Sequence, residues 1–172
     1  MPMTAVQIAA VALVLVASVG DVRTRRIPNV LTFGAALTAL LFHGVTGGWS
    51  GLVVGVGGWL LGAALFFPIF ALRGMGAGDV KLLAAVGAWL GPAQVIWVAL
   101  LTSVAGGVLG LAVAFGSGYG MTAIRNVRAL LLHWRVFGVR PLPQVTLEGA
   151  KGPRLAYAVP IAIGTMVTLW LK

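Results

Sequence analysis

A chain of 172 residues has the length of one domain, but 60% of its residues are hydrophobic and only 9% are charged. Charged residues make up about 25% of an ordinary soluble domain. Because too few charges are present to cover a soluble surface, this composition excludes a water-soluble enzyme and a free DNA-binding protein. The net charge of +9 is typical of membrane proteins, in which Lys and Arg collect on the cytoplasmic side, so no nucleic-acid partner is expected. Since the chain contains no Cys, disulfides and thiol catalysis are excluded.

Six apolar segments follow one another, which predicts an all-α, polytopic membrane bundle with about six transmembrane helices. They lie at residues 3–20, 29–44, 51–72, 80–90, 93–115 and 155–171. Within the basic cytoplasmic segment 116–154, residues 124–137 alternate Arg with apolar side chains. That pattern predicts a helix lying on the membrane surface, with anionic lipids as partners of the basic segment. Residues 138–152 are expected to form a loop.

The basic residues set the expected orientation. With six spans and the N-terminus outside, every one of the 12 Lys and Arg except Lys172 falls on the cytoplasmic side, as positive charges do in membrane proteins. We therefore expect both termini outside (N-out/C-out). The first segment is not expected to be a cleavable signal peptide, because its positive charges follow it rather than precede it.

The chain has only three acids, Asp21, Asp79 and Glu148. Asp21 follows the first predicted span and Asp79 precedes the fourth, where ionisable groups are costly and mark function by default. Two carboxylates that share a site cannot both ionise cheaply, so one keeps a proton near neutral pH. The ionised one can activate water while the protonated one polarises a carbonyl. The dipole of the fourth helix is expected to favour the charge at Asp79 and to leave the proton on Asp21.

The acids also have structural interpretations. Asp21 could form a surface ion pair with Arg23 or Arg25, and Asp79 could be the N-cap of the fourth helix. Glu148 lies in the basic segment and is interpreted as a solvated or Arg-paired loop acid.

Residues near Asp79 leave further alternatives open. Gly76 and Gly78 could form a simple turn, or they could let an extended substrate approach the backbone closely. Lys81 could tune the charge of Asp79 or extend to the membrane interface. His43 and His133 have no acid at ligand spacing, so no metal and no cofactor are expected.

Three segments resemble the signatures of type IV prepilin peptidases, the aspartic GxGD membrane peptidases. Gly76-Ala-Gly-Asp79 is a GxGD motif and resembles the second-aspartate signature. Residues 21–32 resemble the first, with an Asp followed by a basic turn and Ile-Pro-Asn. Tyr157-Ala-Val-Pro-Ile-Ala162 resembles the C-terminal span of the family. The resemblance covers residues 1–115 and 155–171.

The resemblance implies a single membrane-embedded peptidase domain over residues 1–172, with Asp21 and Asp79 as the catalytic residues. It implies Gly76, Gly78 and Lys81 as substrate-binding or motif-supporting residues.

The implied activity is removal of the leader peptide of type IV, Flp-like prepilins or pseudopilins. It would take place at the cytoplasmic face of the bacterial inner (cytoplasmic) membrane, in pilus assembly or protein secretion. The chain resembles the short, CpaA/TadV-like form without the N-terminal methyltransferase domain, so methylation of the product is not expected. Two alternatives stay open, a small proton-coupled transporter and a non-catalytic pilus assembly subunit. The peptidase is favoured because both acids lie at the cytoplasmic ends of predicted spans and the fourth span is almost purely apolar.

Overall fold

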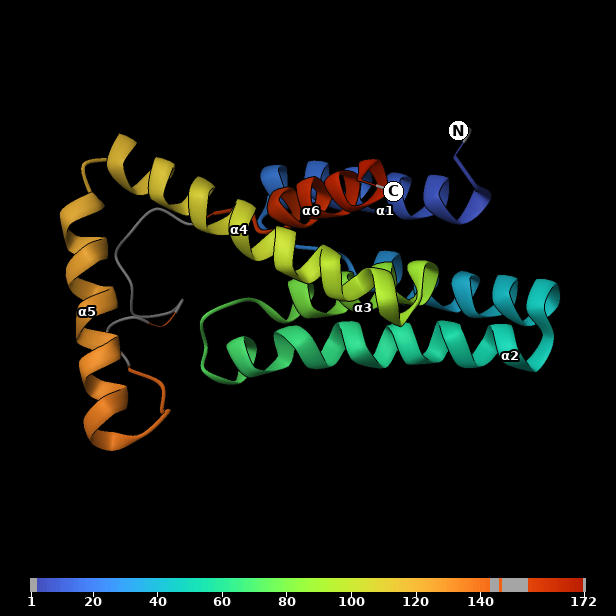
Figure 1. The fold of residues 1–172 in the computed structure, drawn as a ribbon. Coiled ribbons are helices and arrows are strands. Elements are labelled where there is room, and N and C mark those ends of the chain that lie inside the picture. Colours follow the sequence, from blue (N-terminus) through green and yellow to red (C-terminus); the bar gives the residue numbers. More distant parts are fainter. Residues whose placement is uncertain (1–2, 143–145, 147–154, 172) are drawn as a thin grey trace.

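The structure, a computed structural model, describes residues 3–142, 146 and 155–171, and within them every regular element is a helix. The helices are α1 (Ala5–Thr24), α2 (Asn29–Ala71), α3 (Ala77–Leu90), α4 (Pro92–Gly116), α5 (Gly120–Phe137) and α6 (Ala158–Trp170). Figure 1 shows α1, α2, α3, α4 and α6 lined up side by side in one bundle, with α5 lying across one end of it. The predicted all-α architecture is confirmed.

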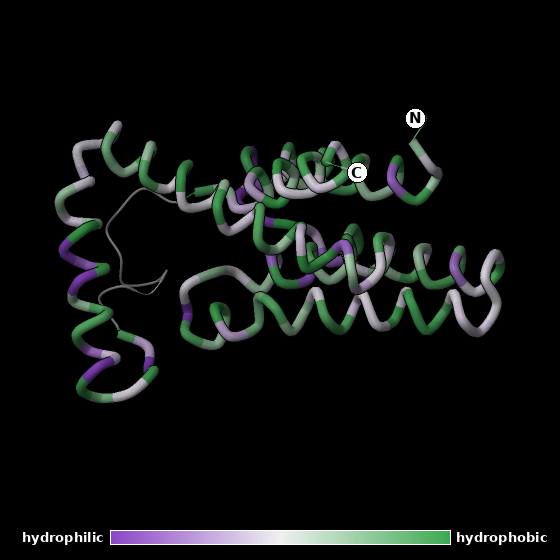
Figure 2. The backbone as a smooth tube through the Cα atoms, viewed as in Figure 1, coloured by the Kyte–Doolittle hydropathy of each residue, from purple (hydrophilic) through white to green (hydrophobic). Residues whose placement is uncertain are grey.

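Three helices, α1, α2 and α4, are long and apolar enough to cross a membrane, and α6 is a shorter apolar helix of 13 residues. Figure 2 shows hydrophilic residues alternating with hydrophobic ones along α5, while the bundle helices are mostly hydrophobic with a few hydrophilic positions. Large apolar side chains on the outside of the bundle are exposed, such as Phe33, Leu37, Trp97 and Leu100. This is the surface expected of a membrane protein, whose outer side chains face lipid.

The helix α2 contains both the second and the third predicted span. It runs through 43 residues, and only Gly48 has a non-helical backbone, with φ 58° and ψ −145°. A straight helix of this length would measure roughly 65 Å, about twice the hydrocarbon core of a bilayer. Instead the chain reverses at Gly48, which as a glycine adopts a positive φ without strain, and α2 becomes a hairpin of two arms (Figure 1). Residues 45–50, which lie between the second and third predicted spans, are therefore helical except at this one residue.

The centre of the bundle is α3, which packs most closely against α2. All residues of α3 from Leu82 to Leu90 are buried. The second arm of α2 presents Gly58 and Gly62 to it, so closely that a Cβ added at Gly58 would clash with the carbonyl of Gly87. Small residues of this kind let two helix backbones approach in a lipid environment. The tight packing fixes the position of α3 and therefore of the residues in its first turn.

Three of the helix boundaries that differ from the prediction lie close to the two aspartates or to α6. Helix α1 continues through Asp21 to Thr24 and ends at Arg25, whose left-handed backbone (φ 55°) caps the helix and whose N–H bonds the carbonyl of Asp21. Helix α3 begins at Ala77 rather than at residue 80, and α6 begins at Ala158 rather than at residue 155. Asp21 and Asp79 thus belong to helices rather than to the loops beside them.

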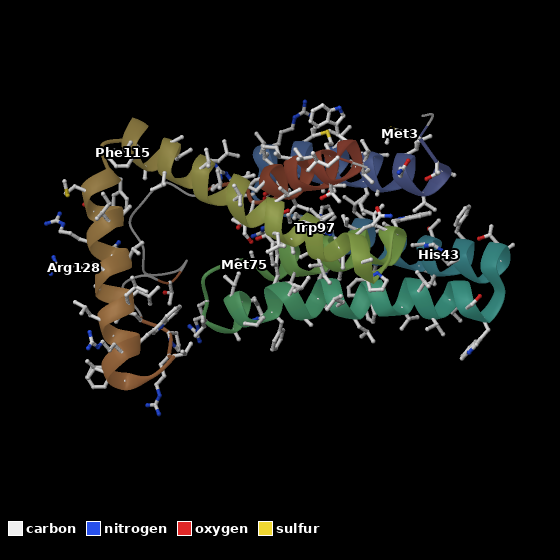
Figure 3. The ribbon with its side chains drawn as sticks, viewed as in Figure 1. Met3, His43, Met75, Trp97, Phe115 and Arg128 are labelled. Carbon is white, nitrogen blue, oxygen red and sulfur yellow. The ribbon has the colours of Figure 1, made fainter. Side chains whose placement is uncertain are left out.

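One end of the bundle is crossed by α5 (Figure 1). The last turn of α1 and the first turns of α3 and α6 lie toward this end, and the N-terminus lies at the other (Figure 1). Met3 and His43 mark the far end, whereas Met75 and Arg128 lie toward the end with α5 (Figure 3). The predicted surface helix is confirmed as a helix, with an earlier start at Gly120. Among the described helices it contacts only α4.

Candidate active site

Asp21 is a buried acid that faces the inside of the bundle. Only 7% of the residue is exposed, and its Oδ2 accepts a hydrogen bond of 3.2 Å from the backbone N–H of Ala158, the first residue of α6. The carbonyl of Ala158 in turn accepts a hydrogen bond of 3.0 Å from the hydroxyl of Ser18, one turn earlier on α1. Both backbone groups of Ala158 are therefore bonded to α1. The interpretation of Asp21 as a surface residue is wrong, because it is buried and its carboxylate points inward to α6.

Asp79 lies in the first turn of α3 and is half-buried. The N-cap of this helix is Gly76 rather than Asp79. The Oδ2 of Asp79 accepts a hydrogen bond of 3.2 Å from the Gly76 N–H, which is one of the donors that the start of a helix leaves unpaired. A Cβ added at Gly76 would lie 3.2 Å from the same oxygen. Gly76 therefore lets the backbone approach the carboxylate of Asp79 closely.

The fold brings the two aspartates into one site. They come from α1 and α3, which are separated by the whole of α2, yet their carboxylates lie close enough for their charges to interact. Each carboxylate also accepts an N–H from the N-terminus of a helix, Asp79 from that of α3 and Asp21 from that of α6. The expectation that Asp79 holds the charge and Asp21 the proton was based only on the dipole of the helix that carries each residue. Because α6 offers Asp21 the same favourable end of a dipole, that argument no longer distinguishes the two acids.

The two signature segments, residues 21–32 and the GxGD region, also contact each other through residues other than the two aspartates. The Nζ of Lys81 donates a hydrogen bond of 2.9 Å to Oδ1 of Asn29 at the start of α2 and lies 5.3 Å from the centroid of the Phe33 ring. Residues two apart on a helix point about 200° apart, so Lys81 is turned away from Asp79. A Cβ added at Gly78 would lie 3.3 Å from the side chain of Ile27. Lys81 and Gly78 therefore hold the first signature against the second, and the expected tuning of Asp79 by Lys81 has no contact to carry it.

The other sequence candidates lie elsewhere. Nε2 of His43 forms a 3.0 Å hydrogen bond with the carbonyl of Trp89 at the far end of the bundle. The ring of His133 stacks on Phe137 within α5, with centroids 5.0 Å apart. Glu148 lies outside the described residues, as does most of the predicted loop at 138–152.

Two neighbouring residues of the site, Tyr157 and Ala158, had no role assigned from the sequence. Tyr157 is the N-cap of α6 and directly precedes Ala158. The available signal was the resemblance of residues 157–162 to the C-terminal span of the family. A backbone N–H has no sequence signature, so the bond from Ala158 to Asp21 could not be read from residue types.

Comparisons with known proteins agree on one family. Residues 8–111 match the model of the type IV leader peptidase family. The chain is 34% identical over 159 residues to the prepilin leader peptidase/N-methyltransferase of Aeromonas salmonicida, covering 87% of this chain and 46% of that protein. It is 36% identical over 109 residues to the protein of the same name from Xanthomonas campestris pv. campestris, covering 57% of this chain and 36% of that protein.

The corresponding protein of Burkholderia pseudomallei is 36% identical over 107 residues, which cover 58% of this chain and 34% of that protein. The chain thus spans less than half the length of the curated relatives it matches. No solved structure matches it. The family model covers more than half of the chain and includes both aspartates, so the chain belongs to the type IV leader peptidase family.

Proposed function

We propose that this protein is an aspartic endopeptidase of the bacterial inner membrane that removes the leader peptide of Flp-like prepilins or pseudopilins at the cytoplasmic face. The observation that supports the proposal is that Asp21, in the last turn of α1, and Asp79, in the first turn of α3, lie on packed helices at the same end of the bundle. Membership of the leader peptidase family and the names of the relatives support the substrate class. Because the relatives are longer proteins, methylation of the product is not part of the proposal.

The dyad can hydrolyse a peptide bond without a covalent intermediate. The ionised carboxylate takes a proton from water as the water oxygen bonds to the carbonyl carbon of the scissile peptide. The protonated carboxyl of the partner donates its proton to the carbonyl oxygen, which stabilises the charge that develops there. When the tetrahedral intermediate collapses, the C–N bond breaks, the leaving amine takes a proton from the carboxyl that accepted one from water, and a hydroxyl of the intermediate returns its proton to the other carboxylate. The hydrogen bonds from Gly76 and Ala158 hold the two carboxylates in place for these steps.

Co-expression with a Flp-type prepilin tests the function. We expect the precursor to shorten in membranes that contain the wild-type protein, and mass spectrometry of the product to show a new N-terminus immediately before the hydrophobic segment. Membranes without the protein should hold the full-length precursor. An unprocessed precursor beside abundant wild-type protein would contradict the proposal and favour a transporter or a non-catalytic assembly subunit.

The proposed orientation places the end with α5 in the cytoplasm. Arg23, Arg73 and Arg128 all belong to this end, which agrees with the rule that basic residues stay inside. It follows that α5 lies along the inner surface of the membrane, because it crosses the direction of the spans (Figure 1). Its mixture of arginines and exposed apolar residues, among them Leu131, suits a surface rich in anionic lipid.

Thiol labelling tests this orientation and the lipid surface that follows from it. The chain has no Cys, and two exposed serines offer conservative positions, Ser50 beside the α2 turn and Ser117 between α4 and α5. A membrane-impermeant maleimide added to intact spheroplasts should label Ser50→Cys and should leave Ser117→Cys unlabelled until the membrane is opened. The reverse pattern would place the dyad and α5 on the outer face and remove the anionic inner leaflet as the partner of α5.

A further inference from the structure

The N-terminus of α6 contacts Asp21 but lies outside both of the signature segments that contain the aspartates. Its first residue, Ala158, donates its N–H to Asp21 over 3.2 Å. A hydrogen bond of this length depends on the position of the helix end, because a shift of about 1 Å separates the donor from the acceptor. Whatever fixes this end of α6 therefore also fixes the Asp21 carboxylate relative to Asp79.

The side chain of Tyr157, the residue before Ala158, is placed where it can fix the N-terminus of α6. Its ring packs edge-on against Phe66 of α2, with centroids 6.1 Å apart and an interplanar angle of 71°. Phe66 is itself only 2% exposed, so it is a firm surface for the ring to pack on. On the other side the ring reaches α4 at Gly106, where an added Cβ would lie 2.6 Å from the phenolic oxygen and 2.9 Å from Cζ. The ring is thus held between two helices, and the missing side chain of Gly106 makes the space for it.

We infer that Tyr157 is a positioning residue of the peptidase: its ring, held between Phe66 and Gly106, fixes the N-terminus of α6 so that Ala158 keeps Asp21 aligned with Asp79. This inference rests on the proposed function and adds to it a residue outside both aspartate signatures. The contact with Phe66 is made by the ring alone, whereas at Gly106 both the ring carbons and the phenolic oxygen lie against the glycine. Among the described residues the hydroxyl has no hydrogen-bond partner.

A ring series tests the inference through kinetics. In Tyr157→Leu the ring is lost, and we expect kcat for prepilin cleavage to fall about 10- to 100-fold, since misplacement of catalytic groups by about 1 Å has effects of this size. The KM should stay unchanged, because the ring positions an acid rather than the substrate. Tyr157→Phe keeps the ring and should retain activity within about threefold. If Tyr157→Phe is as inactive as Tyr157→Leu, the hydroxyl is a chemical participant and the inference fails.

Filling the space beside Gly106 is a second, independent way to displace the Tyr157 ring. Gly106→Ala should displace the ring and lower kcat as Tyr157→Leu does. Gly107→Ala is the matched control, because a Cβ at Gly107 meets nothing within 4 Å. Combining Gly106→Ala with Tyr157→Phe removes the closest of the clashing atoms and should restore part of the lost activity. Equal activity of the Gly106→Ala and Gly107→Ala proteins would overturn the inference.

Cross-linking measures the same positioning without using activity. Cysteines placed at Ser18 and Ala158, whose side-chain and backbone oxygens lie 3.0 Å apart, would be the only ones in the chain. Oxidation should join them efficiently with Tyr157 or Phe at position 157 and poorly with Leu. If the double-cysteine protein with Leu at position 157 cross-links as efficiently as the one with Tyr157, the positioning role is refuted even where prepilin is cleaved. If the wild type cleaves no prepilin but the cross-link depends on the ring, the proposed function fails while the positioning role stands.

Discussion

Replacing either aspartate by asparagine should nearly abolish leader removal without lowering the amount of protein in the membrane. An amide can neither take a proton from water nor donate one as an acid, and a positioned acid or base contributes about 10²–10⁴-fold to a rate. The fold should tolerate both changes, because Asn is nearly isosteric with Asp. Its carbonyl oxygen can still accept the N–H of Ala158 at position 21 and that of Gly76 at position 79.

The chain offers one matched control for this pair, since Glu148 is its only other acid. Cells that make Glu148→Gln protein should process a prepilin as the wild type does, while Asp21→Asn and Asp79→Asn cells accumulate the precursor. Immunoblots of prepilin and of the membrane protein, read together, distinguish loss of chemistry from loss of protein. Full processing by either Asp→Asn protein would contradict the dyad.

A single methyl group at Gly58 should destabilise the bundle strongly. A Cβ there would clash with the carbonyl of Gly87 and would lie 2.8 Å from the Cα of Gly91. Both are backbone atoms of tightly packed segments, so neither can move aside as a flexible side chain would. Overpacking of this kind costs about 1–3 kcal/mol or more, and it outweighs the gain of about 1 kcal/mol that alanine brings to a helix.

The neighbouring glycine gives the control, because a Cβ at Gly57 meets nothing within 4 Å. Thermal unfolding of the purified proteins in detergent should show a lower midpoint for Gly58→Ala by several degrees, since about 1 kcal/mol shifts the midpoint by about 2–4 °C at this size. The midpoint of Gly57→Ala should equal or exceed that of the wild type. Equal midpoints for the two variants would show that α2 and α3 are not packed as described.

The fold could be predicted from the sequence because membrane spans are specified by apolar length, which is a local property. The alternation of Arg with apolar residues located the helix α5 in the same way. The connection between the second and third predicted spans was not predicted correctly. Six residues at 45–50 were expected to form a linker, but a single glycine with a positive φ reverses the chain while its neighbours stay helical. A turn set by one backbone angle leaves little trace in composition.

The candidate site was predictable only in part, for a related reason. Asp21 and Asp79 were identified because acids are rare in this chain and costly at membrane depth. The division of charge between them was argued from the dipole of each residue's own helix and omitted the N-terminus of α6, which the fold brings to Asp21. The side chain of Tyr157 fits beside Gly106 because glycine has no Cβ. This fit depends on two residues that are distant in the sequence, so neither residue alone predicts it.

The central claim is that Asp21 and Asp79 act as one catalytic unit, and a double-mutant cycle in reconstituted membranes tests it most directly. Purified wild type, Asp21→Asn, Asp79→Asn and the double variant would each cleave the same purified prepilin in proteoliposomes, with initial rates taken from the released leader. Residues that act as a unit lose their effect together. We therefore expect both single variants and the double variant to fall to one residual rate. If the two losses multiply in the double variant, or if either single variant keeps substantial activity, the two acids do not form a dyad.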